Sequence, residues 1–234
     1  MMNLKGQLID NPNKDRALKI LWESRRISEF DDAHEVVDFG LGRDFSVFVV
    51  KESKDTEFLK FVFKGKDNFQ INEKLKLLNT KTESPIIDNS TSNKNFESCE
   101  SMWSSTHLLY RTQHNDMKIT SVGNDSHGQL FPKGNKEDNM NEIHIKDAAI
   151  GSEHGLILSD TEKVYAWGWG EHGNCGLQTN AKEKEDVTFD YLNLIFDSMR
   201  SDLKGQSGSK SHVIGLFCGC ATSWVVLEND YTKT

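Results

Sequence analysis

The feature that most constrains the fold of this chain is an internal repeat made of two alternating kinds of segment. The first kind is an apolar strand that runs into a glycine-rich turn, and it is clearest at residues 118–130 and 164–177. The second kind is a strand, a short polar turn and another apolar strand. Its copies lie at 36–50, 101–110, 148–158 and 217–227. Such a chain builds its core by stacking similar units, so the repeat determines the fold before any single motif does.

The spacing of the repeats predicts the architecture. Equivalent points in the second kind of segment are separated by 61, 48 and 68 residues, namely Phe45, Thr106, His154 and Thr222. The shortest spacing lies close to the ~40–50 residues of a four-stranded propeller blade. The two longer spacings require inserts, which repeat proteins accommodate as surface loops. We therefore predict an all-β fold, a β-propeller in which residues 1–234 form a single partial array of antiparallel blades.

Two inserts interrupt the repeats. Residues 78–95 are polar and rich in turn formers, so we expect them to be disordered. Residues 179–212 form a longer insert, in which apolar residues from Val187 to Leu203 recur at helical spacing. Asp186 is a suitable N-cap, and the pattern predicts a helix over 186–203. This helix either covers the rim of the blades or binds a partner, and packing is the commoner role of such a face.

Charge and composition exclude several classes of function. Lys and Arg number 28 against 36 Asp and Glu, a formal net charge of -8, whereas proteins that grip nucleic acid present a basic face. No run approaches the ~18 apolar residues of a membrane-spanning helix, and the start of the chain lacks the apolar core of a signal peptide. We expect no direct nucleic-acid or membrane binding. The four cysteines are then expected to be reduced thiols in a cytoplasmic and nuclear protein.

The residue patterns of an enzyme or a metal site are missing from the sequence. The glycines at 170–173 lack the Lys-Ser/Thr that follows a phosphate-binding loop. Histidines recur at repeat positions, as is typical of hydrogen-bonded structural residues, and no nucleophile–base constellation can be identified. These histidines are His107, His127, His154 and His172. The Cys218-Gly-Cys220 spacing differs from the Cys-x-x-Cys of structural zinc sites. We predict no enzymatic activity, no cofactor and no bound metal.

Aromatic residues and one turn remain as candidates for packing and partner contact. Trp103, Trp167 and Trp224 lie in apolar strands or beside them, and we expect them to be mainly structural. Loops on a rigid scaffold carry binding more often than strand interiors do. We therefore predict a partner-binding site on the glycine-rich turn and expect the turn to be exposed at Glu171, His172 and Asn174. Its predicted residues are Trp169, Glu171, His172 and Asn174.

The glycine-rich segment carries a family resemblance. Residues 164–176 read VYAWGWGEHGNCG, and residues 151–155 read GSEHG. Together they resemble the repeat of the regulator of chromosome condensation family, whose members are seven-bladed β-propellers. Weaker similarity extends to residues 101–107, 126–131 and 219–224, while the inserts do not match. The resemblance implies a propeller with about three and a half of seven blades, and an N-terminal half missing through truncation or an incomplete gene model.

The resemblance also implies a function. The residues are most similar to a fungal member of the family that pairs with a small zinc-binding electron-carrier protein of diphthamide biosynthesis. Through that pair it supports Elongator-dependent modification of wobble uridines in tRNA, as well as diphthamide synthesis. The expected function is therefore that of a non-enzymatic adaptor. The alternative, by analogy with the family's founding member, is a guanine-nucleotide exchange factor or regulator for a small GTPase.

Overall fold

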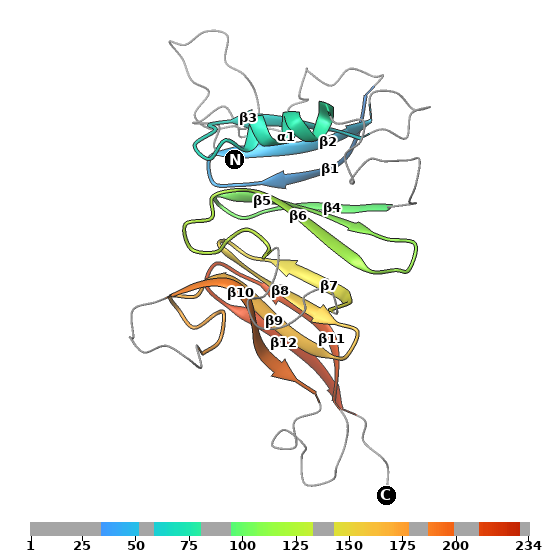
Figure 1. Ribbon diagram of the computed structural model, residues 1–234, viewed down its shortest axis with the longest axis vertical. Helices are drawn as coiled ribbons and strands as arrows, with labels where there is room; N and C mark the ends of the chain where they lie inside the picture. The colour runs from blue at the N-terminus through green and yellow to red at the C-terminus, as the bar shows by residue number, and fades with distance from the viewer. Residues whose placement is uncertain are drawn as a thin grey trace, which may run out of the picture. The chain divides into compact units, whose positions relative to one another are not determined.

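The structure is a computed structural model that describes residues 34–51, 59–80, 95–132, 143–177, 187–198 and 211–229. Within these ranges the chain is almost entirely β-strand, and the paired strands run antiparallel. This confirms the predicted fold class. The chain divides into two compact units (Figure 1). One comprises residues 1–113 and 119–124, and the other comprises residues 114–118 and 125–234.

The first unit contains two groups of three paired strands and one helix. Its first sheet has the order β1-β2-β3. These strands are β1 (Glu35–Leu41), β2 (Phe45–Lys51) and β3 (Leu59–Gly65). The next three strands also pair in chain order. They are β4 (Asn95–Ser101), β5 (Ser105–Arg111) and β6 (Met117–Gly123), and β6 enters this unit from Ile119 on. In β2 and in β5, every residue except the last is buried. This pattern is typical of strands that are covered on both faces.

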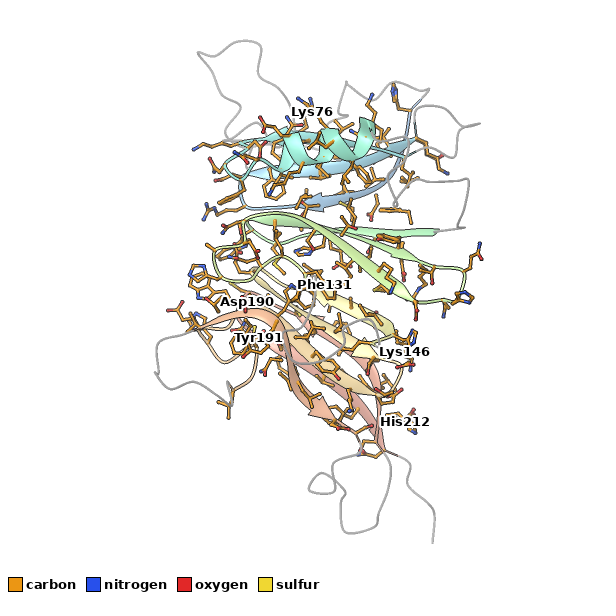
Figure 2. The ribbon with its side chains drawn as sticks, in the orientation of Figure 1. Lys76, Phe131, Lys146, Asp190, Tyr191 and His212 are labelled. Atoms are coloured by element: carbon orange, nitrogen blue, oxygen red, sulfur yellow. The ribbon has the colours of Figure 1, made fainter. Side chains whose placement is uncertain are left out.

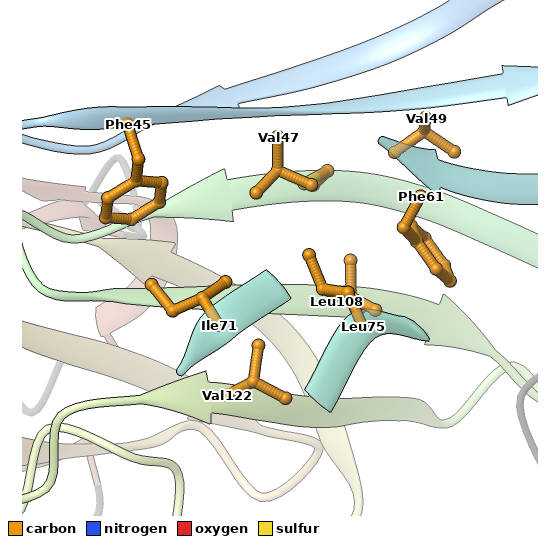
Figure 3. Packing of buried hydrophobic residues seen from close by; sticks show 9 residues of the cluster. Phe45, Val47, Val49, Phe61, Ile71, Leu75, Leu108 and Val122 are labelled. Atoms are coloured by element: carbon orange, nitrogen blue, oxygen red, sulfur yellow. The ribbon is translucent and has the colours of Figure 1, made fainter. Parts of the chain in front are cut away.

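The helix α1 (Ile71–Thr80) completes the core of the first unit. Its start is capped by the Asp67 carboxylate, which accepts hydrogen bonds from the backbone N–H groups of Ile71 at 2.7 Å and Asn72 at 3.0 Å. Ile71 and Leu75 are buried against apolar side chains of the sheets (Figure 3). In the described part of the chain, no helix is long and apolar enough to span a membrane.

The helix corrects the predicted boundary of the first insert. Leu78 packs against the core cluster, and Asn79 exchanges two hydrogen bonds with the backbone of Phe61, at 2.9 and 3.0 Å. The start of the segment 78–95 is therefore ordered, because it docks on β3 instead of leaving the surface. Residues 81–94 of that prediction lie outside the described residues.

The second unit is built around four consecutively paired strands with a hairpin packed against them. These four strands follow the order β10-β9-β8-β7 within a seven-stranded sheet, and β11 pairs with β12. These strands are β7 (Ile145–Ile150), β8 (His154–Ser159), β9 (Lys163–Trp169), β10 (Thr188–Asp197), β11 (Ser211–Cys218) and β12 (Ser223–Asn229). Leu156, Leu158 and Val164 of the sheet form one apolar cluster with Val213 and Leu216 of the hairpin.

Glu162 fastens the hairpin to the sheet at one end of these strands. One carboxylate oxygen accepts the Val213 N–H of β11 at 2.9 Å, and the other accepts Lys146 Nζ of β7 at 3.0 Å. Burial opposes the charge, but the hydrogen bonds from Val213 and Lys146 prevail and lower the Glu162 pKa. Figure 2 shows Lys146 and His212 at this end, and Asp190 at the other.

The predicted helix over 186–203 is wrong: residues 188–197 form the strand β10. β10 pairs with β9, and its register shifts between Phe189 and Asn193 and again between Leu194 and Phe196. The first irregularity buries Phe189, Leu192 and Asn193, positions that are three and four apart. A distorted strand can therefore bury residues at helical spacing. The buried set is not the predicted helical face, however, since Leu194 of that face is 45% exposed and Tyr191 and Ile195 are only partly buried. The remaining residues of the insert, 178–186 and 199–210, lie outside the described residues.

A β-bulge recurs in the first strand of each repeat unit. The pairing register skips one residue in each of β1, β4, β7 and β11. The skipped residues are Val37, Glu97, Lys146 and Ile214, and all four are exposed. A bulge leaves one residue unpaired and bends its strand. The repeat is thus preserved in backbone geometry at positions where the residue type is not.

Candidate functional site

The candidate site is the turn that follows β9, residues 169–177, here called the Trp169 turn. Two backbone hydrogen bonds fold it, from Gly173 N to Gly170 O and from Gly176 N to Gly173 O, both at 3.0 Å. Gly173 has a φ of 76° and Gly176 a φ of 81°. An added Cβ at Gly173 would meet nothing within 4 Å, so the backbone conformation and not crowding explains this glycine. The sequence Gly-Glu-His-Gly therefore folds locally into a tight turn.

Three side chains fix the turn to its surroundings. Asn174 Nδ2 donates to Trp169 O at 2.9 Å, which closes the turn on itself. Asn193 Nδ2 of β10 donates to Cys175 O at 2.7 Å, and Ser223 Oγ of β12 donates to Asn174 O at 2.7 Å. The turn is thus held by β10 and by β12 as well as by its own strand. A turn held in this way is pre-organised for binding.

The predicted contact residues divide into an exposed pair and an anchor. Glu171 and His172 are exposed, and Trp169 is half-buried. Asn174 is buried, with 7% of its surface exposed, because its amide is needed inside the turn. The prediction that Asn174 belongs to the exposed part of the turn is therefore wrong. Asn174 positions Glu171 and His172 and does not face solvent itself.

His127 belongs to this site, although its recurrence in the repeats predicted only a structural role. Its imidazole stacks on Trp169, with ring centroids 4.9 Å apart and an interplanar angle of 25°. The His127 N–H donates to Gln129 Oε1 at 2.8 Å, which fixes the turn that carries the ring. The signal in the sequence is the shared His-Gly pair of the two glycine-rich segments, at His127 and at His172. The site therefore combines an aromatic pair with a charged turn. Asp190, at the start of β10, is exposed beside the backbone of Gly128 (Figure 2).

Trp167 is the packing centre beneath the Trp169 turn. It is fully buried, its Nε1–H donates to Gln129 O at 3.1 Å, and Phe131 meets it edge-on at 5.1 Å. An added Cβ at Gly155 would lie 2.3 Å from the indole, so only glycine lets the strand pass over the ring. The predicted structural role of Trp167 is confirmed.

The other two tryptophans differ from that prediction. Trp103 is 43% exposed and Trp224 is 63% exposed. Trp103 lies in the turn between β4 and β5. Trp224 lies on β12, a strand whose residues are mostly exposed. Neither is a core residue of its own unit.

Two buried histidines have the structural role that their recurrence predicts. His107 Nδ1 lies 2.8 Å from Ser121 Oγ and its Nε2 lies 3.1 Å from Ser105 Oγ. His154 Nε2 lies 3.0 Å from Ser223 Oγ. Burial lowers the pKa of His107 to about 3 and that of His154 to about 4, so both are neutral at pH 7.

The Ser223–His154 pair has the composition of a nucleophile and its base, but its hydrogen bonds run the wrong way. Ser223 Oγ donates its single proton to Asn174 O at 2.7 Å, so it accepts from His154 Nε2–H. A histidine that donates to the serine is not positioned to remove the serine proton. The pair therefore connects β8 to the Trp169 turn.

The two buried cysteines of the described residues show no sign of reactivity or metal binding. Cys99 and Cys175 are buried, and desolvation raises both pKa values, that of Cys175 to about 12. Both remain thiols at neutral pH and are poor metal ligands. Among the residues with defined positions, no three His, Cys, Asp or Glu side chains gather as a metal site.

Comparison with known proteins identifies the repeat. Residues 145–174, from β7 into the Trp169 turn, match the family model of the Regulator of chromosome condensation (RCC1) repeat. The chain is 34% identical over 93 residues to the Ultraviolet-B receptor UVR8 of Arabidopsis thaliana, covering 36% of this chain and 20% of that protein. It is 33% identical over 70 residues to an RCC1-like G exchanging factor-like protein of Mus musculus, covering 25% of this chain and 15% of the relative.

Solved structures agree on the fold. The structure of Kap60 bound to yeast RCC1 (Prp20) matches with a TM-score of 0.50 and 15% identity, covering 84% of this chain and 42% of that chain. This likeness confirms the predicted propeller type of fold, and at such identity it shows the fold alone. The chain spans less than half the length of each of these proteins.

Proposed function

We propose that this chain is a non-enzymatic protein-binding propeller segment that contacts its partner through the Trp169 turn. The observation that carries the proposal is the exposure of Glu171 and His172 on a turn held by hydrogen bonds from Asn174, Asn193 and Ser223. A rigid turn loses little conformational entropy on binding. The half-buried Trp169, stacked on His127, supplies the aromatic area that binding hot spots favour.

For the partner we propose the small zinc-binding electron-carrier protein of diphthamide biosynthesis. The support is the resemblance of residues 101–107, 126–131, 167–170 and 219–224 to the fungal member of the family that pairs with such a protein, the alpha-tubulin suppressor. The chain would then act indirectly on Elongator-dependent tRNA modification and on diphthamide synthesis, in the cytoplasm and the nucleus. The partner would supply the metal, which is consistent with the buried, protonated thiols of Cys99 and Cys175.

A small GTPase is the second candidate partner. It is favoured by the 33% identity, over 70 residues, to a relative named as an RCC1-like G exchanging factor-like protein. An exchange factor lowers the affinity of the GTPase for nucleotide by binding it differentially, and it needs neither a nucleophile nor a metal of its own. The absence of a catalytic constellation in the described residues is therefore compatible with both candidates.

The two candidates are separated by binding and by nucleotide release. Calorimetric titration of the purified chain with the zinc protein should show binding that the double variant Glu171→Ala/His172→Ala weakens about tenfold or more. His114→Ala is the matched control, because His114 is an exposed histidine on another turn. Release of a fluorescent nucleotide from a small GTPase is then measured with the same proteins. Acceleration of release without binding to the zinc protein would replace the first candidate by the second. If the chain neither binds the zinc protein nor accelerates release, the proposed site is overturned.

A further inference from the structure

Strand β12 is exposed where its repeat equivalents are buried. The second strand of each repeat unit is β2, β5 or β8, and in each the first six residues are buried. β12 occupies the same position in the hairpin, yet Trp224 and four other of its residues are exposed. Its sequence is as continuously apolar as the others at residues 224–227. Strands that read as continuous apolar runs are those covered on both faces.

One face of the hairpin is already covered within its own unit. Val213 and Leu216 of β11 are buried, and Val225 of β12 packs against the same cluster, which includes Leu156 and Leu158 of β8. The opposite face, here called the outer hairpin face, carries four large apolar side chains that are 40–63% exposed. They are Ile214, Phe217, Trp224 and Val226. Scattered exposed apolar residues are ordinary, but four on two paired strands form a patch.

A second exposed apolar face lies on β1. The face, here called the β1 face, consists of Val36, Val37, Phe39 and Leu41, which are 37–54% exposed. On its other side β1 approaches β4 closely: Asp38 Oδ2 accepts the Cys99 N–H at 2.6 Å, and an added Cβ at Gly40 would lie 2.4 Å from Ser101 Oγ. β1 therefore uses one side to pack against the next sheet and presents apolar side chains on the other.

We propose that the outer hairpin face binds the β1 face of a second copy of this chain, head to tail. The contact continues a packing that each unit already contains, in which the first strand of one sheet or hairpin lies against the sheet before it. Within the second unit β11 packs on β7 and β8, and within the first unit β4 packs on β1. In the proposed contact, the outer hairpin face takes the place of the preceding sheet, and the β1 face takes the place of the strand that packs against it. The interface is heterologous, so it joins two different surfaces and not one surface to itself.

Complementary variants test this arrangement. Sedimentation velocity over about 1–100 μM should show a mass that rises with concentration for the unmodified chain. Trp224→Glu on one face and Phe39→Glu on the other should each weaken association about tenfold or more, because each places a charge in an apolar contact. A mixture of the two variants retains one intact face of each kind, so it should form dimers that neither variant forms alone. Ile214→Glu and Leu41→Glu provide a second pair if either first variant fails to fold, as judged by circular dichroism.

Controls and contrary outcomes are distinct from those of the partner-binding proposal. Leu177→Glu changes a residue that is 87% exposed on the Trp169 turn, and it should leave the sedimentation profile unchanged. His172→Ala should likewise have no effect on mass, so failure of one proposal does not entail failure of the other. A chain that stays monomeric throughout the concentration range would overturn the inference. So would association that Trp224→Glu abolishes and Phe39→Glu leaves intact, because that result indicates pairing of two outer hairpin faces.

Discussion

At the scale of single residues, the two tryptophans Trp167 and Trp224 should respond in opposite ways to truncation. Trp167→Ala removes a fully buried indole, its hydrogen bond to Gln129 O and its contact with Phe131. We expect it to lower the free energy of unfolding by roughly 3–5 kcal/mol. Trp224→Ala removes a side chain that is 63% exposed and should cost less than about 1 kcal/mol. Urea unfolding at low protein concentration measures both, and equal losses would contradict the assigned roles.

The buried histidines predict a loss of stability in mild acid. The pKa values of His107 and His154 lie at about 3 and about 4 in the folded chain, below the ~6.5 of an unfolded histidine. The unfolded chain therefore binds more protons as the pH falls below ~6.5, and the stability due to the neutral imidazoles is lost progressively down to the folded pKa values. We expect each histidine to contribute about 2 kcal/mol to the loss between pH 7.5 and pH 5.

The control for this pH dependence is a side chain that hydrogen-bonds but does not titrate. His154→Gln should lower stability at pH 7.5 and should reduce the further loss on going to pH 5. His144→Gln is the matched exposed substitution. The hydrogen bond and the charge of Asp116 raise the pKa of His144, so the pKa shift of this residue is opposite in sign to that of His154. A slope against pH that is the same in His154→Gln as in the unmodified chain would exclude the buried imidazole as its source.

At this scale the sequence predicted chemical types better than exposure. His107, His154 and Trp167 were assigned structural roles from their recurrence and their strand context, and the structure buries all three. The exposure of Trp224 and the burial of Asn174 were not predictable. Both depend on what the rest of the fold places beside them, and the local sequence does not contain that information.

At the scale of elements, two glycines with left-handed backbones distinguish conformation from crowding. Gly128 has a φ of 72°, and an added Cβ would lie 2.6 Å from the backbone of Phe189 and Asp190. Gly173 has a φ of 76° and open space around it. We expect Gly173→Ala to cost about 1–2 kcal/mol of stability from the backbone alone. Gly128→Ala should cost about 1–3 kcal/mol more, because β10 must also move away.

Thermal unfolding of the two variants and of the unmodified chain measures the difference. The Trp169 turn is unchanged in Gly128→Ala except through β10, whose Asn193 donates a hydrogen bond to Cys175 O. A Gly128→Ala variant as stable as Gly173→Ala would show that β10 does not lie against the 126–130 turn.

The elements themselves were predictable where the repeat was clear. The strands at 45–51, 105–111 and 154–159 follow from apolar runs that end in turns. The strand β10 was missed because apolar residues such as Tyr191, Leu194 and Ile195 recur at helical spacing, although β10 buries Phe189 and Leu192 instead. The helix α1 was missed because its start falls between a degraded repeat and a polar insert. The recurring bulges at Val37, Glu97, Lys146 and Ile214 leave no signal in residue type, since only the backbone repeats.

At the scale of the whole molecule, stability is distributed over two separate cores. One cluster contains Val47, Leu75, Leu108 and Cys99, all in the first unit, and the other contains Leu156, Val164 and Cys175, all in the second. Each core is assembled from segments that are close together in the sequence. In such repeat architectures stability is approximately a sum over units and their contacts with neighbours. A destabilising substitution in one unit should therefore lower the stability of that unit first.

The two buried cysteines allow this distribution to be measured in one molecule. Cys220 is exposed, and Cys218 is partly exposed, so an alkylating reagent should modify them in the folded chain. Cys99 and Cys175 should remain protected, because burial raises their pKa values and keeps the reagent away. Under increasing urea, mass spectrometry of the labelled peptides then reports the first unit through Cys99 and the second through Cys175. Trp167→Ala should expose Cys175 at lower urea than in the unmodified chain and should shift Cys99 less. Equal shifts at the two cysteines would instead show that the chain unfolds as one cooperative body, and the repeat would then govern its geometry without dividing its stability.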